Sequence, residues 1–384
     1  MTIVRAGYLY DGTLEPPKQN VDVVVDDGGR IAEIRAATGS CDFEAACVTP
    51  GLVNAHAHLE ASGEPDLMGA FQTTPANERL LNAVANARKA LRAGVTTIRD
   101  VGSSNGFAQS VRDAIEAGKI PGPRMRAAGA VICMTGGHGW PIGRMVDSPW
   151  ESRKAVREQL WAGADCIKFI ATGGVLTKGA VPGNAQLTPD ELNAGVDEAH
   201  RHGLRVAAHA IGTVGIKNAL RAGVDSVEHA TLLDDEAIEL FKRNRTFLVP
   251  TLSAPTCILT HLEDGQQPKY VVDKARGLNE VMLNNLRGAY ERGVRIAGGS
   301  DAGTPYNYHE NYAIEVELMW SMLGMTPQQA LHAATAVAAE LIGLHKGILA
   351  IGEPADMLLL DRNVGDDVRA LQDPKAVIKG GEAV

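Results

Sequence analysis

The chain has 384 residues, of which 45% are hydrophobic and 22% are charged. This composition excludes a disordered or fibrous protein, and no apolar run approaches the roughly 20 residues that a membrane-spanning helix needs. The net charge of −9 comes without a dense cluster of Lys and Arg, which argues against nucleic acid or a membrane as a partner. We therefore expect a soluble globular protein.

Cysteine usage and the start of the chain point to one compartment. The cysteines are scattered, odd in number and free of any CxxC pair, which indicates reduced thiols rather than disulfides or a thiolate metal site. The opening residues, MTIVRAGYLYDGT, lack the basic start and the apolar core of a signal peptide. We expect a cytoplasmic protein.

Both ends of the chain have the pattern of small β elements. Residues 21–35 contain two β-rich stretches around Asp27-Gly28-Gly29, which predicts a hairpin. Near the other end, Gly352-Glu353-Pro354 predicts a turn before a strand at 355–360. We expect the two terminal segments to form together a small discontinuous β-sandwich domain, made of residues 1–50 and 346–384.

The interior, residues 51–345, repeats one unit: a β-rich run, a polar or Gly-rich loop, and a helical pattern. Eight such units without a GxGxxG motif favour an α/β protein with a (β/α)8 TIM barrel over a doubly wound sheet. In a barrel, the chemistry is expected at the C-terminal ends of the strands. The predicted strand segments are 53–56, 96–100, 130–133, 166–170, 206–209, 226–229, 246–250 and 294–297.

Several helix boundaries are legible in the interior. Thr188 and Thr326 each begin a capping box with Pro at the first helical position. Other helices are predicted to end at a glycine just before the next strand, where the left-handed backbone of a helix C-terminus favours this residue. These glycines are Gly94, Gly163, Gly203, Gly223 and Gly293.

Two histidines and a lysine stand at or near the ends of predicted strands. His56 and His58 have i, i+2 spacing, which directs both side chains to one side of an extended strand. Imidazole is a common zinc ligand, although a chance pair would show the same spacing. Lys168 lies within an apolar strand. Either it forms a salt bridge there, or its neutral amine has reacted with carbon dioxide to a carbamate that can bridge two cations.

Three further polar residues end strands of the same repeat. His209 and His229 close the similar runs Val-Ala-Ala-His and Ser-Val-Glu-His, and Asp301 follows the eighth strand. Alone, each histidine could be a core residue, and Asp301 could cap a helix or a turn. A barrel, however, brings all of these groups to one rim. Nitrogen and oxygen donors for two divalent ions, with zinc as the expected metal, match a catalytic site. The candidate ligands are His56, His58, Lys168, His209, His229 and Asp301.

With these residues in place, the sequence resembles the amidohydrolase superfamily of metal-dependent hydrolases over essentially its whole length. Thr49-Pro50-Gly51-Leu52 and Pro354-Ala355-Asp356 match its pattern at the two ends. Gly136-Gly137-His138-Gly139 resembles the imidazolonepropionase-like branch, which holds prolidase-type dipeptidases and Arg/Lys carboxypeptidases. The resemblance implies a homo-oligomer with a binuclear centre: His56, His58 and Asp301 on one ion, His209 and His229 on the other, and carboxylated Lys168 bridging them.

Such a centre predicts hydrolysis of an amide-type C–N bond in a small-molecule substrate: a dipeptide, an Xaa-Pro peptide or an N-acyl amino acid. We expect a metal-bridging hydroxide to attack the carbonyl, while Asp301 takes its proton and later delivers it to the leaving amine. His138 could hydrogen-bond the carbonyl oxygen or only anchor its Gly-rich loop. His309 is a weaker candidate for substrate contact, and Arg99 and Lys178 are candidates for binding a substrate carboxylate.

Two other functions compete with this prediction. One is a mononuclear deaminase or an imidazolonepropionase-type hydrolase of cyclic amides. Deaminase members tend to show His-x-x-Glu at the fifth strand, whereas this chain reads His209-Ala210-Ile211-Gly212 and has Lys168. The other is a barrel scaffold that has lost its chemistry, and such a protein should lack ligands. Here all six positions are filled, which favours the two-metal hydrolase.

Overall fold

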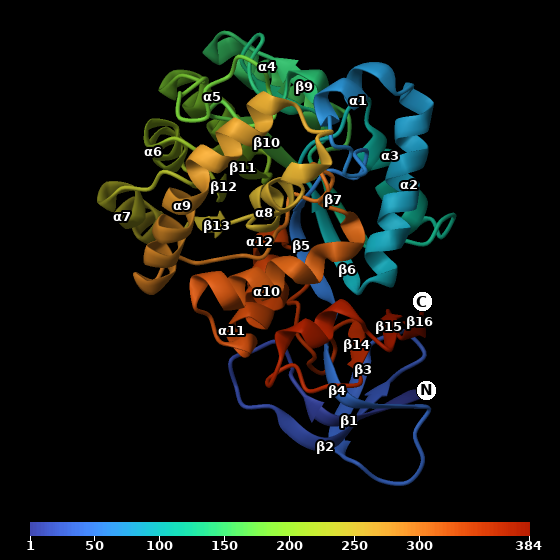
Figure 1. Cartoon of the computed structure of the whole chain (residues 1–384). Coiled ribbons are helices and arrows are strands. Elements are labelled where there is room, and N and C mark those ends of the chain that lie inside the picture. Colours follow the sequence, from blue (N-terminus) through green and yellow to red (C-terminus); the bar gives the residue numbers. More distant parts are fainter.

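Strands from both ends of the chain share one seven-stranded sheet, in the order β16-β15-β14-β4-β1-β2-β3. In this computed structural model, which describes residues 1–384, that sheet lies at one end of the molecule with both termini (Figure 1). The predicted hairpin around residues 27–29 is confirmed, because β2 pairs antiparallel with β3. The strands are β1 (Thr2–Leu9), β2 (Lys18–Val25), β3 (Ile31–Ala36), β4 (Phe43–Pro50), β14 (Met357–Leu360), β15 (Ala376–Lys379) and β16 (Glu382–Ala383).

One face of this terminal sheet is apolar because its strands alternate valine and alanine with polar residues. Val4 and Ala6 of β1, Val23 of β2 and Met357 of β14 are buried in one hydrophobic cluster. β14 pairs antiparallel with β4, so the last forty residues are joined by backbone hydrogen bonds to the first fifty. A sandwich requires a second sheet facing this one, and that part of the expectation stays a prediction.

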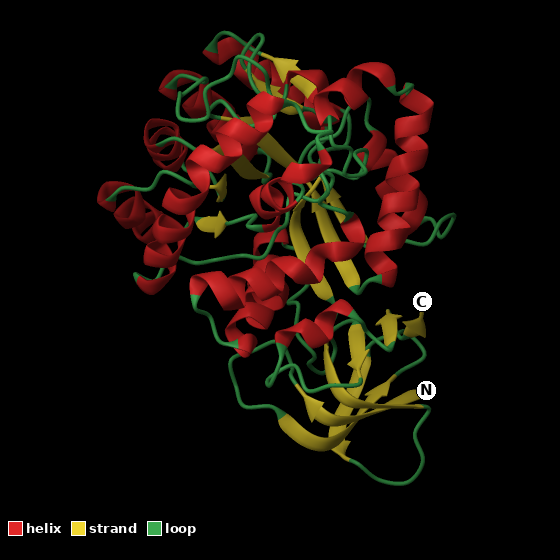
Figure 2. Cartoon of the chain, viewed as in Figure 1, coloured by secondary structure: helices red, strands yellow, loops and turns green.

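The interior strands form two parallel groups, a three-stranded sheet β5-β6-β7 and a six-stranded sheet β13-β12-β11-β10-β8-β9. Helices surround these strands on the outside (Figure 2), so the predicted mixed α/β class is confirmed. The strands are β5 (Leu52–Ala57), β6 (Val95–Asp100), β7 (Arg124–Ala127), β8 (Val131–Cys133), β9 (Gly143–Met145), β10 (Cys166–Ile170), β11 (Arg205–Ala210), β12 (Ser226–His229) and β13 (Phe247–Val249).

The predictions for the eighth and the third interior strand were wrong in detail. Residues 294–297 form no strand, and Ile296 makes only an isolated bridge to Leu248. The chain still runs alongside β5 there, since the Ala55 N–H donates to the Gly298 carbonyl. The third unit contains β7 in addition to β8. β7 escaped prediction because its sequence, RMRA, contains no β-branched or aromatic residue.

The helix boundaries follow the predicted signals. Both capping boxes are confirmed, at Thr188 and Thr326. The five glycines predicted at helix ends all have positive φ, between 69° and 95°. None of the helices combines the length and the apolar character needed to cross a membrane. The helices are α1 (Leu67–Thr73), α2 (Ala76–Arg92), α3 (Phe107–Glu116), α4 (Pro149–Trp161), α5 (Pro189–Arg201), α6 (Thr213–Ala222), α7 (Asp235–Asn244), α8 (Ser253–Thr260), α9 (Lys269–Glu291), α10 (Tyr312–Leu323), α11 (Pro327–His332) and α12 (Ala338–Ile342).

Candidate active site

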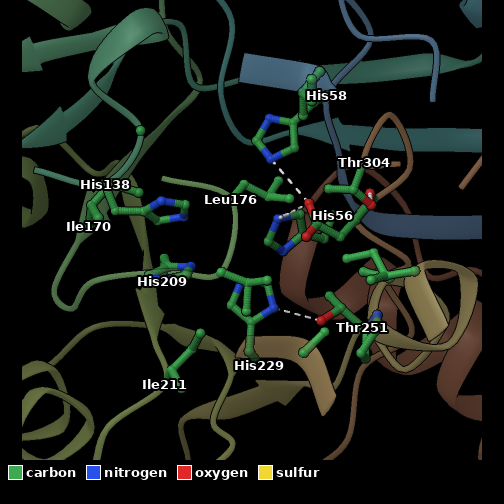
Figure 3. Close-up of a pocket in the computed structure, with 18 of the residues that line it drawn as sticks. His56, His58, His138, Ile170, Leu176, His209, Ile211, His229, Thr251 and Thr304 are labelled. Carbon is green, nitrogen blue, oxygen red and sulfur yellow. Dashed lines mark hydrogen bonds and ion pairs between the residues drawn. The ribbon is translucent and has the colours of Figure 1, made fainter. Parts of the chain in front are cut away.

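A cavity opens at the C-terminal ends of the interior strands, and its floor is formed by side chains from those ends. The register of the strands places these side chains at neighbouring positions along adjacent strands, because Ile170 of β10 pairs with His209 of β11, and Ala210 of β11 pairs with His229 of β12. Within β10, Lys168 and Ile170 face the cavity, while the alternate residues pack into the main hydrophobic core. Figure 3 shows four of the histidine rings directed toward one another, and all six predicted ligands line the cavity: His56, His58, Lys168, His209, His229 and Asp301.

Three of these groups lie close enough to bind one ion. The donor atoms of His56, His58 and Asp301 are all within 4.8 Å of one another. The Asp301 Oδ1 atom is 3.2 Å from His56 Nε2 and 3.3 Å from His58 Nε2. Asp301 reaches this position because its N–H donates to the His56 carbonyl, which places residue 301 beside the end of β5. Two imidazoles and one carboxylate are a donor set that divalent transition metals favour.

The second ring nitrogen of each histidine is already used within the chain. His56 Nδ1 lies 2.7 Å from Glu228 Oε2, and His58 Nδ1 lies 2.9 Å from the Gly102 carbonyl. His209 is held through Nε2 by the Gly173 carbonyl, at 3.1 Å. Because these oxygens accept, the bonded nitrogens carry the protons and the other nitrogens keep free lone pairs. A histidine whose second ring nitrogen donates to a carboxylate or carbonyl oxygen in this way is typical of metal ligands.

His229 completes the group from β12. Its Nδ1 lies 2.6 Å from Thr251 Oγ1, and the Thr251 hydroxyl donates in turn to the Pro250 carbonyl. The His229 ring centroid is 4.7 Å from that of His209 and 5.3 Å from that of His56. Burial lowers the pKa of His229 to about 3 and that of His209 well below its ordinary value. Both rings are therefore neutral near pH 7, as metal ligands must be.

Lys168 is buried and lines the same cavity as the histidines. Burial lowers the pKa of its amine to about 8, although the carboxylates of Glu228 and Asp301 oppose the shift. The salt bridge considered as its alternative role is absent, since Lys168 is not part of any ion pair of the chain. A lysine amine with a lowered pKa is neutral in a larger share of molecules, and the neutral form is the one that reacts with carbon dioxide.

The backbone is strained at three residues that line the cavity. His229, Thr251 and Asp301 have φ values of 70°, 49° and 60°, a left-handed region that residues other than glycine rarely adopt. For Thr251 the cost is larger because its side chain is β-branched. Such strain persists only where the surroundings hold it, and it concentrates at functional sites. Here it turns the three side chains toward the cavity.

The predicted substrate contacts divide into two groups. His138 lines the cavity, with its ring centroid 4.5 Å from that of His209 and its Nδ1 2.8 Å from Thr177 Oγ1. His309 lies outside the cavity lining. It is buried, and its Nε2 donates to the Ala61 carbonyl at 2.9 Å. The structure thus gives His309 a contact that supports the loop after β5, in place of the predicted contact with substrate.

Neither cation considered for a substrate carboxylate reaches the cavity. Arg99 is buried in the core, where its Nη2 lies 3.1 Å from Glu228 Oε1 and its Nε donates to the Ala55 carbonyl. Lys178 is exposed and lies outside the cavity lining. The role considered for Arg99 was wrong, because its sequence position at the end of β6 did not reveal the buried carboxylate that pairs with it.

Glu228 is the functional residue that sequence reasoning passed over. It is fully buried and bonds to His56 on one side and to Arg99 on the other. Burial alone would raise the pKa of Glu228, but Arg99 and His56 outweigh it and hold that pKa well below its usual range. The signal was present in the run Ser226-Val227-Glu228-His229, where a carboxylate precedes a predicted ligand histidine.

Replacing Glu228 by Gln should weaken zinc binding by about 10-fold to 100-fold, because His56 loses the anionic acceptor that orients it and raises its basicity. Competition with a chelator of known affinity measures this change. Glu340→Gln is the matched control, since Glu340 pairs with Arg295 on the surface and has no contact with the site. Unchanged zinc affinity in Glu228→Gln would contradict the orienting role.

Comparison with known proteins decides the family. A model of the amidohydrolase family matches residues 47–384. The chain belongs to the amidohydrolase family. It is 32% identical to ochratoxinase of Aspergillus niger, with 100% of this chain and 86% of that protein covered. The crystal structure of an Xaa-Pro dipeptidase with bound methionine superposes with a TM-score of 0.92 at 33% identity, covering 100% of this chain and 99% of the other.

A more distant relative is imidazolonepropionase of Nocardia farcinica, which is 24% identical over 90% of this chain and 86% of its own length. The resemblance stated from the motifs is therefore confirmed, including the imidazolonepropionase-like and prolidase-like branch. Membership makes this amidohydrolase a hydrolase of carbon–nitrogen bonds, and the His56, His58 and Asp301 group is where a divalent metal of such an enzyme would be held.

Proposed function

We propose that this amidohydrolase is a binuclear enzyme that hydrolyses an amide bond in a small substrate. One observation carries the proposal: all six predicted ligands line the floor of a single cavity. His56, His58 and Asp301 would hold one ion, His209 and His229 the other, and carboxylated Lys168 would bridge them. Zinc is the expected metal, since four imidazoles and carboxylate oxygens suit it.

When bound, the two ions would lower the pKa of a bridging water and polarise the substrate carbonyl. Asp301 is the group placed to move protons. Burial raises its pKa, but His56 and His58 outweigh burial and hold that pKa well below its ordinary value. The ionised carboxylate can accept a proton from the attacking water and afterwards deliver it to the leaving amine.

His138 is proposed to stabilise the carbonyl oxygen as negative charge develops on it. Burial lowers the pKa of His138 to about 4, so its ring is neutral and acts as a hydrogen-bond donor rather than as a cation. Its loop is fixed from both sides, because the His138 N–H donates to Gln186 Oε1 and its ring contacts Thr177. A fixed donor is what an oxyanion site requires.

We also propose that the two parallel sheets and residues 294–302 close into the predicted (β/α)8 barrel, spanning 51–345. Backbone contacts support closure: Ile296 bridges to Leu248 of β13, and Ala302 bridges to Ala57 of β5. The terminal segments, 1–50 and 346–384, are then a separate unit built on the seven-stranded sheet. Self-association and a cytoplasmic location stay predictions from the sequence.

The test combines metal analysis with a substrate screen on one preparation. Elemental analysis of the purified protein should find close to two transition-metal equivalents per chain, and the zinc-loaded protein should release amine from members of a library of dipeptides, Xaa-Pro peptides and N-acyl amino acids. A single equivalent would favour the mononuclear alternative. Full metal loading without amine release from any amide would contradict the hydrolase proposal.

A further inference from the structure

The cavity above the ligand group has a polar floor and apolar walls. The walls are formed by Phe71 of α1, Ile142 of the short 3-10 helix Trp140–Ile142, Leu176 of the loop after β10, Ile258 of α8 and Leu278 of α9. These side chains come from five separate segments, so the apolar lining is not the property of a single helix or loop. The long helix α9 lies across this end of the strands (Figure 1).

The walls carry no charged side chain. Lys168 and Asp301 are the only charged residues that line the cavity, and both belong to the floor. Cations close to the walls are held by the chain itself. Lys274 Nζ donates to the carbonyls of Gly174 and Thr177, at 3.3 and 2.8 Å, and Arg79 beside the Phe71 ring pairs with Glu60.

The polar groups that remain on the walls are neutral. Thr231, Thr304 and Asn279 can hydrogen-bond an amide or a carbonyl, but none can balance a negative charge. A free carboxylate held against these walls, away from the floor, would lose its water without meeting a charged side chain of the wall that could pair with it, which is costly. An apolar group gains free energy at the same place, because its surface is removed from water.

We propose that the preferred substrate is an uncharged amide with an apolar group that packs between α1, α8 and α9, rather than an amide in which that group carries a free carboxylate. This inference rests on the proposed amide hydrolysis. Water is the co-reactant: the C–N bond breaks, the acyl carbon gains OH and the nitrogen gains H. Within each substrate class predicted from the sequence, the uncharged derivatives should be hydrolysed with a higher kcat/KM than the free acids.

A matched pair of anilides tests the preference on the zinc-loaded enzyme. N-acetyl-para-toluidine and N-acetyl-para-aminobenzoate have the same scaffold and differ by methyl against carboxylate. We expect kcat/KM to be higher for the toluidide by a factor of about 10 to 200, the range that one group in an apolar pocket provides. The carboxylate makes the aminobenzoate the better leaving group, so intrinsic reactivity opposes the expected result. An equal or higher kcat/KM for the aminobenzoate overturns the inference.

A calorimetric binding experiment on the metal-free protein separates this inference from the proposed function. The toluidide should bind at least about tenfold more tightly than the aminobenzoate, since the walls are present without metal. Leu278→Lys, which places an ammonium on the wall, should reverse this order. Val281→Lys is the control, because Val281 is 46% exposed, lies three residues further along α9 and does not line the cavity.

The outcomes are distinguishable. Selective binding of the toluidide without turnover of any amide would contradict the proposed hydrolase and leave the apolar substrate site standing. Turnover of both anilides with equal kcat/KM and equal binding would overturn the substrate inference and leave the hydrolase standing. Binding of neither probe, or an order of binding that Leu278→Lys and Val281→Lys change alike, also overturns the substrate inference.

Discussion

Asp301→Asn should reduce kcat by about 10²-fold to 10⁴-fold while the protein retains its metal, because the amide keeps an oxygen ligand but cannot accept a proton. Asp301 is the one carboxylate that lines the cavity, so no neighbouring side chain can take over this step. The ionised state that the step requires is set by His56 and His58, which hold the pKa of Asp301 well below its ordinary value against the effect of burial.

Elemental analysis and steady-state kinetics on the same sample measure the two parts of this prediction. Asp273→Asn is the matched control, since Asp273 is an exposed residue of α9 that pairs with Lys269. An Asp301→Asn enzyme with normal turnover would remove Asp301 from proton transfer. Loss of metal together with activity would show that its carboxylate is needed first of all as a ligand.

Lys168→Ala should abolish turnover, and short carboxylic acids such as acetate or propionate, supplied with bicarbonate, should restore part of it. The reason is that the alanine leaves space at the buried position that Lys168 occupied in the cavity lining, where a small carboxylate can substitute for the carbamate proposed on Lys168. In chains whose Lys168 is not carboxylated, the variant also removes a buried amine that has no ion-pair partner, so the stability of the fold should fall less than the activity.

Kinetics with and without added carboxylate, together with metal analysis, test this prediction. Lys178→Ala provides the control, since Lys178 is exposed, lies ten residues further along the chain and does not line the cavity. When the protein without substitutions is incubated with isotope-labelled bicarbonate, the label should be detected in a carbamate on Lys168. Full activity of Lys168→Ala without any added acid would refute the bridging role.

Local sequence patterns were sufficient to predict several elements of the fold and the candidate ligands. The capping boxes at Thr188 and Thr326 and the hairpin at Asp27-Gly28-Gly29 were predicted because the residues that form them are neighbours in the sequence. The candidate ligands were found for a similar reason. His209 and His229 end β-rich runs, and parallel strands bring such ends to one edge of a sheet.

The contacts that could not be predicted from the sequence join residues that lie far apart in the chain. Glu228 and Arg99 are 129 residues apart, and only folding shows that they pair in the core and orient His56. The segment 294–297 has the composition of a strand but pairs with a neighbouring strand only at Leu248, whose N–H donates to the Arg295 carbonyl and whose carbonyl accepts from the Ala297 N–H, so it lacks a regular ladder.

The sequence by itself determined the mixed α/β class and the candidate ligand residues, because both follow from periodicity and from residue type at strand ends. The tertiary structure decided the surroundings of the candidate site residues. It shows that His309 supports a loop and that Arg99 pairs with Glu228 in the core, and it places Leu278 of α9 in an uncharged wall of the cavity. The physical reason is that a side chain's chemistry depends on its neighbours in space, and at this cavity those neighbours come from segments far apart along the chain.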